Sequence, residues 1–351
     1  MKIDHFEIDR NSPCFIIAEL SANHNGKLET AIETIRAAKR AGADAIKLQT
    51  YTADTLTIDC DKDDFKLKAG SIWDGMRFYE LYQQAYTPWE WHPTLIETAR
   101  EEGLICFSSP FDPTAVDFLE KLNVPAYKIA SFEITDIPLI EYVASKGKPI
   151  ILSTGIAGTE DIELALDACK RMGNDQIALL KCTSSYPAPI EEANMAMIPD
   201  LAERYQVIAG LSDHTMGSTV PVVAVSLGAK IIEKHFILDR SIGGPDASFS
   251  MTEQEFSEMV RAVREAEAAV GKISYQLTEK QQNGKAFSRS LYVVEDICKG
   301  EVFTEKNLRS IRPGFGLHPK YYQEILGQTC NQDVERGTAM SLSFLSKDGN
   351  E

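Results

Sequence analysis

The sequence predicts a (β/α)8 TIM barrel, an α/β fold, followed by a small, mostly β domain. Eight apolar, β-rich segments alternate with helical patterns over about the first 270 residues, which matches an eightfold βα repeat better than an open doubly wound sheet. No GxGxxG motif follows any of these segments, which disfavours a dinucleotide-binding fold. After Gly271 the pattern changes to short strands and turns.

Each predicted strand is a short apolar run, and each predicted helix has apolar residues at helical spacing. The strands are residues 14–20, 45–51, 105–110, 126–131, 149–155, 177–183, 207–213 and 230–236. The helices are residues 28–41, 88–102, 113–122, 137–146, 159–172, 193–205, 218–227 and 252–270. The last helix opens with Thr252 and Glu255 in a capping box and ends at Gly271.

Three further segments complete the predicted organisation. Residues 52–87 are too long for a simple βα loop, and their aromatic residues indicate an excursion with a short helix over the barrel mouth. We expect a barrel over residues 1–272, a polar, patternless linker over 273–286 and a small domain over 287–347. A module of this size is marginal unless it packs on something else.

The composition excludes some classes of partner. There are 36 Lys and Arg against 52 Asp and Glu, a net charge of −16, and the cations form no cluster. This argues against nucleic acid and anionic membranes as partners. It does not argue against a small anionic ligand, because charges beyond about 8 Å are screened and only lysines close to the ligand determine whether it binds. No apolar segment has signal-peptide or membrane-spanning character, and the seven cysteines are scattered. We therefore expect a cytoplasmic protein in a reducing compartment.

Two histidines end neighbouring predicted strands. His214 follows one strand and His235 ends the next, so both imidazoles emerge at the same edge of a parallel sheet. The period of two places Ser212 on the face of His214, and Glu233 on the face of His235. Two imidazoles beside carboxylates suit a divalent metal, although two unrelated polar residues that cap strands would give the same pattern.

Every predicted strand ends in polar residues, and barrel enzymes build their sites at these carboxyl ends. They are Glu19, Lys47, Gln49, Ser108, Ser109, Lys128, Ser131, Glu133, Ser153, Thr154, Lys181, Thr183, Tyr186, His214 and His235. Lys47 and Lys128 lie inside apolar strands, where an unpaired ammonium is costly. With the hydroxyls they suit a phosphate or carboxylate ligand, but structural ion pairs with Glu19 or Glu133 would also explain them.

The motifs resemble the N-acetylneuraminate synthase family in order along the whole barrel. They are AELSANHNG (18–26), KLQT (47–50), FSSPF (107–111), KIASFE (128–133), LSTG (152–155), LLKCTSSYPAP (179–189), GLSDHT (210–215) and EKHF (233–236). The tail resembles the antifreeze-like SAF (β-clip) module of these enzymes through SRSLYV (288–293), DICKGEVFTEKNL (296–308) and RPGFGL (312–317). AELSANHNG, in place of the usual AEIGVNHNG, and Lys181, in place of a histidine, resemble the pseudaminic acid synthase branch.

The resemblance implies a synthase that condenses phosphoenolpyruvate with the open-chain aldehyde of an acetamido hexose and releases phosphate. For the pseudaminic branch, the sugar would be 2,4-diacetamido-2,4,6-trideoxy-L-altrose. The implied metal is Mn²⁺ or Mg²⁺ on His214 and His235. From its place at the end of the first strand, Glu19 is the best candidate to position or deprotonate the attacking water, and Glu133 is second choice. The implied phosphoenolpyruvate site is Lys47, Ser109, Lys128, Ser131, Ser153, Thr183 and Ser212. The implied sugar contacts are Gln49, Tyr186, Asp246 and Arg312.

Arg312 would come from the small domain of a partner subunit, so the resemblance implies a homodimer with exchanged tails. The RPGFG turn suits recognition of an acetamido carbonyl or a carboxylate, although without the family resemblance a plain surface arginine is the stronger interpretation. Two alternative functions remain at this stage. One is an N-acetylneuraminate or legionaminate synthase with the same chemistry, and the other, more remote, is a non-catalytic carbohydrate- or ice-binding protein.

Overall fold

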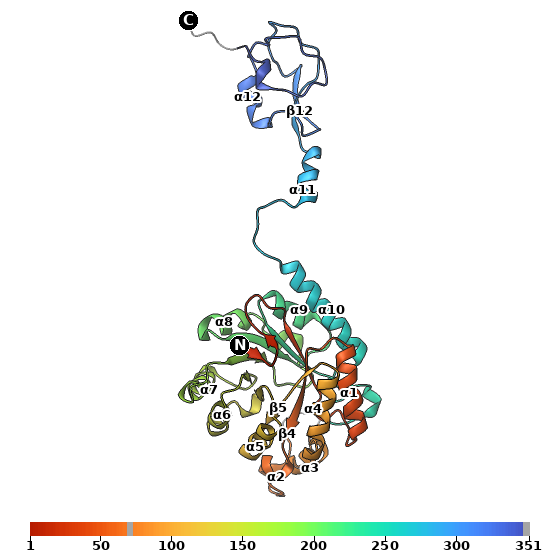
Figure 1. Ribbon diagram of the computed structural model, residues 1–351, viewed down its shortest axis with the longest axis vertical. Coiled ribbons are helices and arrows are strands. Elements are labelled where there is room, and N and C mark those ends of the chain that lie inside the picture. Colours follow the sequence, from red (N-terminus) through yellow and green to blue (C-terminus); the bar gives the residue numbers. More distant parts are fainter. Residues whose placement is uncertain (69–72, 347–351) are drawn as a thin grey trace. The chain divides into compact units, whose positions relative to one another are not determined.

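Eight parallel strands close into a barrel in the first of two units, Met1–Gly271 and Lys272–Glu351, into which the chain divides (Figure 1). The computed structural model describes residues 1–68 and 73–346. In barrel order the strands are β3 (Phe15–Glu19), β4 (Ala45–Thr50), β5 (Ile105–Pro110), β6 (Tyr127–Ile129), β7 (Ile150–Ser153), β8 (Ile177–Cys182), β9 (Ile208–Asp213) and β10 (Ile231–His235). β10 pairs with β3 and closes the ring, so the predicted barrel is confirmed.

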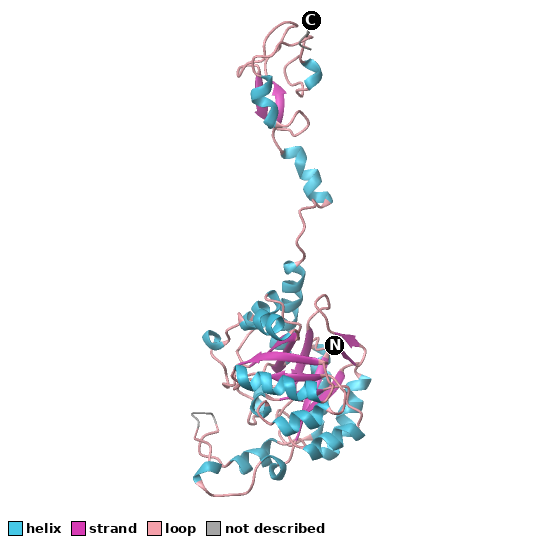
Figure 2. Cartoon of the chain, turned by 90° about the vertical axis from the view of Figure 1, so that its left-hand side faces the viewer, coloured by secondary structure: helices cyan, strands magenta, loops and turns pink. Residues whose placement is uncertain are grey.

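One helix follows each barrel strand and covers its outer side (Figure 2). These helices are α1 (Leu28–Arg40), α4 (His92–Glu101), α5 (Pro113–Lys121), α6 (Ile137–Ala144), α7 (Thr159–Arg171), α8 (Met197–Tyr205), α9 (Thr219–Ser226) and α10 (Glu253–Val270). α10 begins with the predicted capping box between Thr252 and Glu255. A hairpin of β1 (Lys2–Ile3) and β2 (Phe6–Glu7) precedes the barrel, and its Ile3 packs in the inner core.

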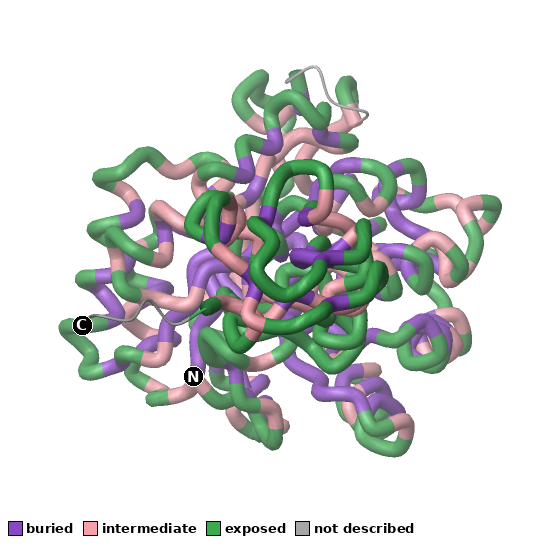
Figure 3. The backbone as a smooth tube through the Cα atoms, turned by 90° about the horizontal axis from the view of Figure 1, so that it is seen from above, coloured by how far each residue is buried: buried purple, intermediate pink, exposed green. Residues whose placement is uncertain are grey.

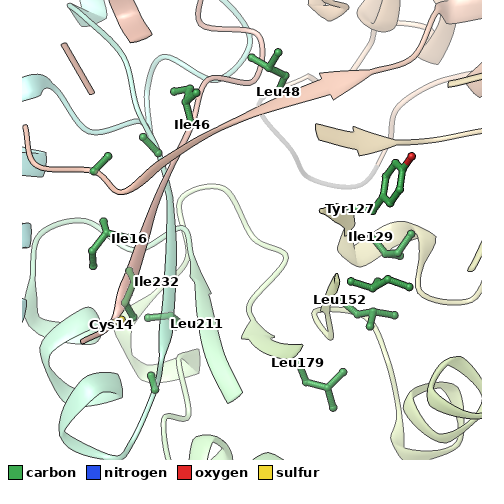
Figure 4. Packing of buried hydrophobic residues seen from close by; sticks show 14 of the residues in the cluster. Cys14, Ile16, Ile46, Leu48, Tyr127, Ile129, Leu152, Leu179, Leu211 and Ile232 are labelled. Carbon is green, nitrogen blue, oxygen red and sulfur yellow. The ribbon is translucent and has the colours of Figure 1, made fainter. Parts of the chain in front are cut away.

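Alternation along the strands produces two apolar cores. Even-numbered residues of β3 and β4, such as Ile16 and Ile46, point outward and pack against the helices (Figure 4). Odd-numbered residues of the same strands, such as Ile17 and Ala45, point into the barrel and fill its lower part. Burial is therefore highest in the strands and on the inner sides of the helices (Figure 3).

Gly210 in β9 shows how tightly this interior is filled. A Cβ at this position would lie 2.5 Å from the carbonyl oxygen of Ile231 and 2.6 Å from Leu180 Cδ2. Real Cβ atoms are not found so close to other atoms, so only glycine allows β9 and β10 to approach at this point.

The described part of the predicted excursion between β4 and α4, residues 52–68 and 73–87, contains two short α-helices. They are α2 (Ala53–Leu56) and α3 (Phe78–Ala85), and a 3₁₀ turn, Asp63–Phe65, lies between them. Leu56, Leu67 and residues of α3 reach the cavity at the barrel mouth, which confirms that the excursion covers it. Residues 69–72 of the predicted excursion lie outside the described residues.

The second unit contains a small antiparallel sheet and its own core. β11 (Ser290–Val293) pairs with β12 (Leu308–Ile311), further isolated bridges extend the pairing, and α12 (Tyr322–Ile325) packs beside them. The segment that we expected to be a patternless linker contains α11 (Glu279–Gly284), which a capping box of Thr278 and Gln281 initiates. Residue 347 of the predicted small domain lies outside the described residues. Within the described part of the chain, no helix has the length and apolar character needed to cross a membrane.

Candidate active site

The inward-facing residues change from apolar to polar at the carboxyl ends of the barrel strands. Here they line a cavity of about 730 Å³, together with aromatic residues of the excursion and the loops. Its polar lining is Glu19, Ser21, Lys47, Gln49, Lys128, Ser131, Glu133, Ser153, Cys182, Ser184, Ser185, Tyr186, Ser212, His214, Glu233, His235 and Asp246. This volume is within the usual range for small-molecule sites.

Two lysines and two glutamates form a buried ionic cluster at the floor of this cavity. Lys47 pairs with Glu19 on the neighbouring strand, and its Nζ lies 3.6 Å from Glu233 Oε1 and 3.2 Å from Ser109 Oγ. Nζ of Lys128 lies 3.4 Å from the same Glu233 oxygen. The lysines are thus paired, as the structural alternative expected, but among the described residues the second partner is Glu233 rather than Glu133. These ion pairs do not conflict with anion binding, because both lysines also line the cavity.

Burial and pairing shift the pKa values within the cluster. Burial raises the pKa of Glu19 to about 7, against the attraction of Lys47, and the charge of Glu233 raises it further. For Glu233, the two lysines outweigh burial and lower the pKa. Burial lowers the pKa of Lys128, whereas Glu19 and Glu233 overcome burial and raise that of Lys47. Glu233 is therefore the permanent anion, and Glu19 can exchange a proton near neutral pH.

The structure brings His214 and His235 together, with 5.3 Å between their ring centroids. Nδ1 of His214 lies 2.9 Å from the carbonyl oxygen of Thr183. Since a carbonyl only accepts, Nδ1 carries the proton in the neutral ring, and Nε2 keeps a lone pair. Nδ1 of His235 is buried without a hydrogen bond and lies 3.7 Å from Asp246 Oδ2. Burial, and then the charge of His214, hold the pKa of His235 well below its usual value, so that this ring is neutral.

These side chains fit a divalent metal ion that takes its remaining ligands from elsewhere. The neutral ring of His235, Nε2 of His214 in its neutral form and the nearby carboxylate of Asp246 are suitable donors. Burial opposes protonation of His214, but Cys182 and the carbonyl of Thr183 outweigh it and raise the pKa of this ring, so a metal would have to displace its proton. No set of three or more His, Cys, Asp or Glu in residues 1–68 and 73–346 could hold a metal by itself. An ion on His214 and His235 would therefore keep coordination positions for water or substrate, as a Lewis-acid site requires.

The hydroxyls predicted to bind phosphoenolpyruvate have different surroundings. Ser153 Oγ is buried without a partner, Ser131 Oγ lies 2.5 Å from Ser184 Oγ, and Ser212 donates to Glu233. Thr183 instead directs its hydroxyl to the carbonyl oxygen of Glu192, at 3.1 Å. Cys182 at the end of β8 and Ser184 in the loop after it line the cavity, and Thr183 between them does not.

The predicted sugar contacts in the barrel lie on one side of the cavity. Gln49 Nε2 donates to Ser21 Oγ at 3.0 Å, and Ser21 in turn donates to Asp246. Burial raises the pKa of Asp246, although hydrogen bonds from Ser21 and from the backbone of Ala22 oppose the shift. Tyr186 packs on His214, with 4.3 Å between ring centroids. Arg312 is an exposed residue of the second unit, and its approach to a sugar belongs to the proposal below.

An aromatic and aliphatic wall faces these polar groups. Trp73 of the excursion packs on Tyr186 and Phe249, and Phe78, Leu81 and Tyr82 of α3 extend the same wall. The cavity thus has an ionic floor and a wall suited to methyl groups and sugar faces. His24, in the NHNG segment after β3, is buried against Trp91 and Thr87 and does not line the cavity.

A closed barrel with titratable and cationic groups at the carboxyl ends of its strands defines an enzyme of the barrel type. A model of the NeuB family matches residues 34–275, and a model of the SAF domain matches residues 288–345. The chain belongs to the NeuB family, whose members are sialic-acid-synthase-type enzymes that use phosphoenolpyruvate. The alternative of a non-catalytic carbohydrate-binding protein is therefore wrong.

Relatives match the chain along nearly its full length. It is 50% identical to the pseudaminic acid synthase of Campylobacter jejuni subsp. jejuni serotype O:23/36 (strain 81-176), over 98% of this chain and 99% of that protein. It is 37% identical to the N,N'-diacetyllegionaminic acid synthase of Legionella pneumophila, over 93% of both. A crystal structure of the spore coat polysaccharide biosynthesis protein SpsE of Bacillus subtilis has a TM-score of 0.67 and 34% identity, over 99% of both chains.

Five polar cavity residues were absent from the sequence-based site: Ser21, Cys182, Ser184, Ser185 and Glu233. Glu233 shares its strand face with His235, so the period of two already placed it at the barrel mouth. Cys182 and Ser184 follow from the same alternation, counted from the inward-facing Leu180. Nothing in the positions of these residues along the sequence predicts that one carboxylate, Glu233, pairs with two lysines from other strands.

Glu133 gives a test of the electrostatics through stability. Burial raises its pKa from the ordinary 4.5 to about 7, so the folded protein holds this proton more tightly than the unfolded chain. Stability is therefore lost as the pH rises from about 4.5 through 7. Relative to a Glu133→Gln variant, the wild type is expected to lose on the order of 2 kcal/mol across this range in urea unfolding. Glu203→Gln, on the exposed side of α8, is the control, and equal slopes for wild type and Glu133→Gln would contradict the assignment.

Proposed function

We propose that the chain condenses phosphoenolpyruvate with 2,4-diacetamido-2,4,6-trideoxy-L-altrose to give pseudaminic acid and phosphate. One observation carries this proposal: two lysines fixed beside serine hydroxyls line the barrel cavity of a chain that is half-identical, over nearly its whole length, to a pseudaminic acid synthase. Identity to the legionaminic acid synthase is lower, at 37%, so the related acetamido hexoses are the second candidates.

Phosphoenolpyruvate is proposed to bind over the ionic floor. Lys47 and Lys128 would face its carboxylate and phosphate, with hydroxyls donating around them. The proposed donors are Ser109, Ser131, Ser153, Thr183 and Ser212. Ser153 Oγ supports this assignment best, because it is buried with no partner. Ser109 acts through Lys47, and Thr183 would have to turn its hydroxyl away from the carbonyl of Glu192.

The sugar is proposed to bind between Gln49, Tyr186 and Asp246 and the apolar wall. A 6-deoxy sugar with two acetamido groups presents three methyl groups, which suit Trp73 and the residues of α3. This position brings its aldehyde near the two histidines. C3 of phosphoenolpyruvate then forms the new bond to the aldehyde carbon, water adds at C2, and phosphate leaves by C–O cleavage.

Glu19 is the proposed group that positions or deprotonates this water, and Glu133 is second choice. A carboxyl with a pKa near 7 can take a proton at the pH at which the enzyme works. Its Oε1 accepts the backbone N–H of Ser21, which fixes its orientation toward the cavity. His214 and His235 would hold Mn²⁺ or Mg²⁺, which, when bound, supplies Lewis-acid polarisation of the aldehyde oxygen.

We also propose that the second unit of a partner subunit completes the site through Arg312, in a homodimer with exchanged tails. Arg312 begins the RPGFG turn and is exposed, as is Phe315 in the same turn. A cytoplasmic setting is part of the proposal. The seven cysteines are unpaired, as is usual in a reducing compartment.

The substrate proposal is tested by phosphate release from a panel of acetamido hexoses with phosphoenolpyruvate. The highest kcat/KM is expected for 2,4-diacetamido-2,4,6-trideoxy-L-altrose, because loss of one well-packed methyl or one satisfied amide lowers it by about 10-fold or more. N-acetylmannosamine and the legionaminate precursor are the comparison substrates. A higher kcat/KM with either of these sugars would reassign the enzyme within its family.

The metal proposal is tested by chelation. Treatment with EDTA is expected to lower turnover by about 100-fold or more, and Mn²⁺ or Mg²⁺ should restore it. Binding of Mn²⁺, followed by electron paramagnetic resonance, should weaken in His214→Ala and in His235→Ala. Full turnover after chelation, or unchanged Mn²⁺ binding in both variants, would exclude this metal site.

Exchange of tails is tested by mixing two inactive variants, Arg312→Ala and His214→Ala. After subunit exchange, about half of the dimers contain one of each, and each has one intact site, so about a quarter of wild-type activity is expected. Arg309→Ala, at another exposed arginine of the second unit, should be active alone. If the mixture is no more active than its separate components, Arg312 does not act across subunits.

A further inference from the structure

Ser21 occupies an unusual backbone conformation at the edge of the cavity. It lies two residues after the end of β3, has a φ of 47°, and is only 3% exposed. Residues other than glycine are uncommon in this left-handed region, where Asn and Asp are the usual exceptions and serine is not. Such strained conformations persist where a function requires them.

The hydroxyl of Ser21 connects two residues that are proposed to contact the sugar. An ionised carboxylate can only accept, so Ser21 donates its hydroxyl proton to Asp246. The same oxygen accepts from Gln49 Nε2 at 3.0 Å. The Asp246 carboxylate therefore fixes the direction of both hydrogen bonds, and Ser21 fixes which end of the Gln49 amide faces it.

The free end of Gln49 is its carbonyl oxygen. Gln49 lines the cavity, and its Oε1 has no hydrogen-bond partner among the described residues. Without Ser21, the amide could turn over and present its NH₂ group instead. An acceptor at this position suits an amide N–H or a hydroxyl of the sugar, and it disfavours a carbonyl group there.

We infer that Ser21 is a positioning residue for acceptor specificity, which holds the carbonyl oxygen of Gln49 toward a hydrogen-bond donor of the acetamido sugar. This inference rests on the proposed function. The backbone N–H of Ser21 has a separate task, because it donates to Glu19 Oε1 at 3.1 Å. Glycine adopts the same backbone conformation without strain, so Ser21→Gly removes the hydroxyl and keeps the contact to Glu19.

The test compares Ser21→Gly, Ser21→Ala and Gln206→Gly by steady-state kinetics and thermal unfolding. Gln206 has a φ of 54°, lies exposed at the end of α8 and is remote from the cavity lining. Gln206→Gly should raise Tm by a few degrees, whereas in Ser21→Gly the relief of backbone strain is offset by loss of the hydrogen bond to the buried Asp246. Only Ser21→Gly should raise the KM for the sugar, by about 10-fold, with kcat and the KM for phosphoenolpyruvate within about twofold of wild type. Ser21→Ala should give the same KM for the sugar but a lower Tm.

A Gln49→Ala variant, alone and combined with Ser21→Gly, tests whether the effect passes through Gln49. If it does, the double variant has the same KM for the sugar as Gln49→Ala alone. Independent, multiplying effects would overturn the inference, as would an unchanged KM for the sugar in Ser21→Gly or an equal rise in both KM values. If the wild type releases phosphate with no acetamido hexose, the proposed function fails first and the inference with it.

Discussion

The burial of Lys47, Lys128, Glu19 and Glu233 inside one barrel is the constraint on which the site depends. Two ammonium groups beneath a layer of side chains cost several kcal/mol each unless carboxylates accompany them. Four different strands supply the members, so the cluster forms only when the ring is closed. Removal of one carboxylate would leave a buried charge without its partner. The apolar layer below, with Ile17 and Ala45, keeps water away and makes these pairings strong.

Burial also explains why two carboxyls of the cavity titrate near neutrality, because it outweighs the attraction of the lysines. With Lys47 and Lys128 already matched by carboxylates, an anionic substrate brings surplus negative charge into the cavity. Glu19 and Glu133, whose pKa values burial raises to about 7, can reduce that surplus by holding protons. His214 and His235 offer a second route, because a divalent cation held by them would add two positive charges. Protonation of these carboxyls and binding of a cation by the histidines would thus both offset the negative charge of the substrate.

The fold was predictable because apolar strands and helices alternate regularly, and the period of two placed Lys47, Lys128, His214 and His235 at one end of the ring. The carboxylate that pairs with both lysines was not predictable, because Glu233 contacts them from a strand that is distant in sequence. The hydroxyl of Thr183 shows a related limit. Side chains alternate between the inner and outer faces along a strand, so a polar residue at a strand end can face either the cavity or the outside. In the loop after β8, Ser184 rather than Thr183 lines the cavity. The helix α11 was missed because a capping box is weak evidence in an otherwise polar segment.

Ser21 shows why the finer chemistry of the site cannot be obtained from residue types alone. A serine after a strand normally indicates a turn or a helix cap, and nothing in the sequence reports its positive φ. In that conformation two groups of Ser21 form hydrogen bonds. Its N–H donates to Glu19, and its hydroxyl donates to Asp246 and accepts from Gln49. Local strain at one residue therefore links the proposed water-activating carboxylate to the proposed sugar contacts. Because the two links use different atoms of Ser21, substitution of its side chain can change selectivity for the sugar while the geometry of the reaction centre is kept.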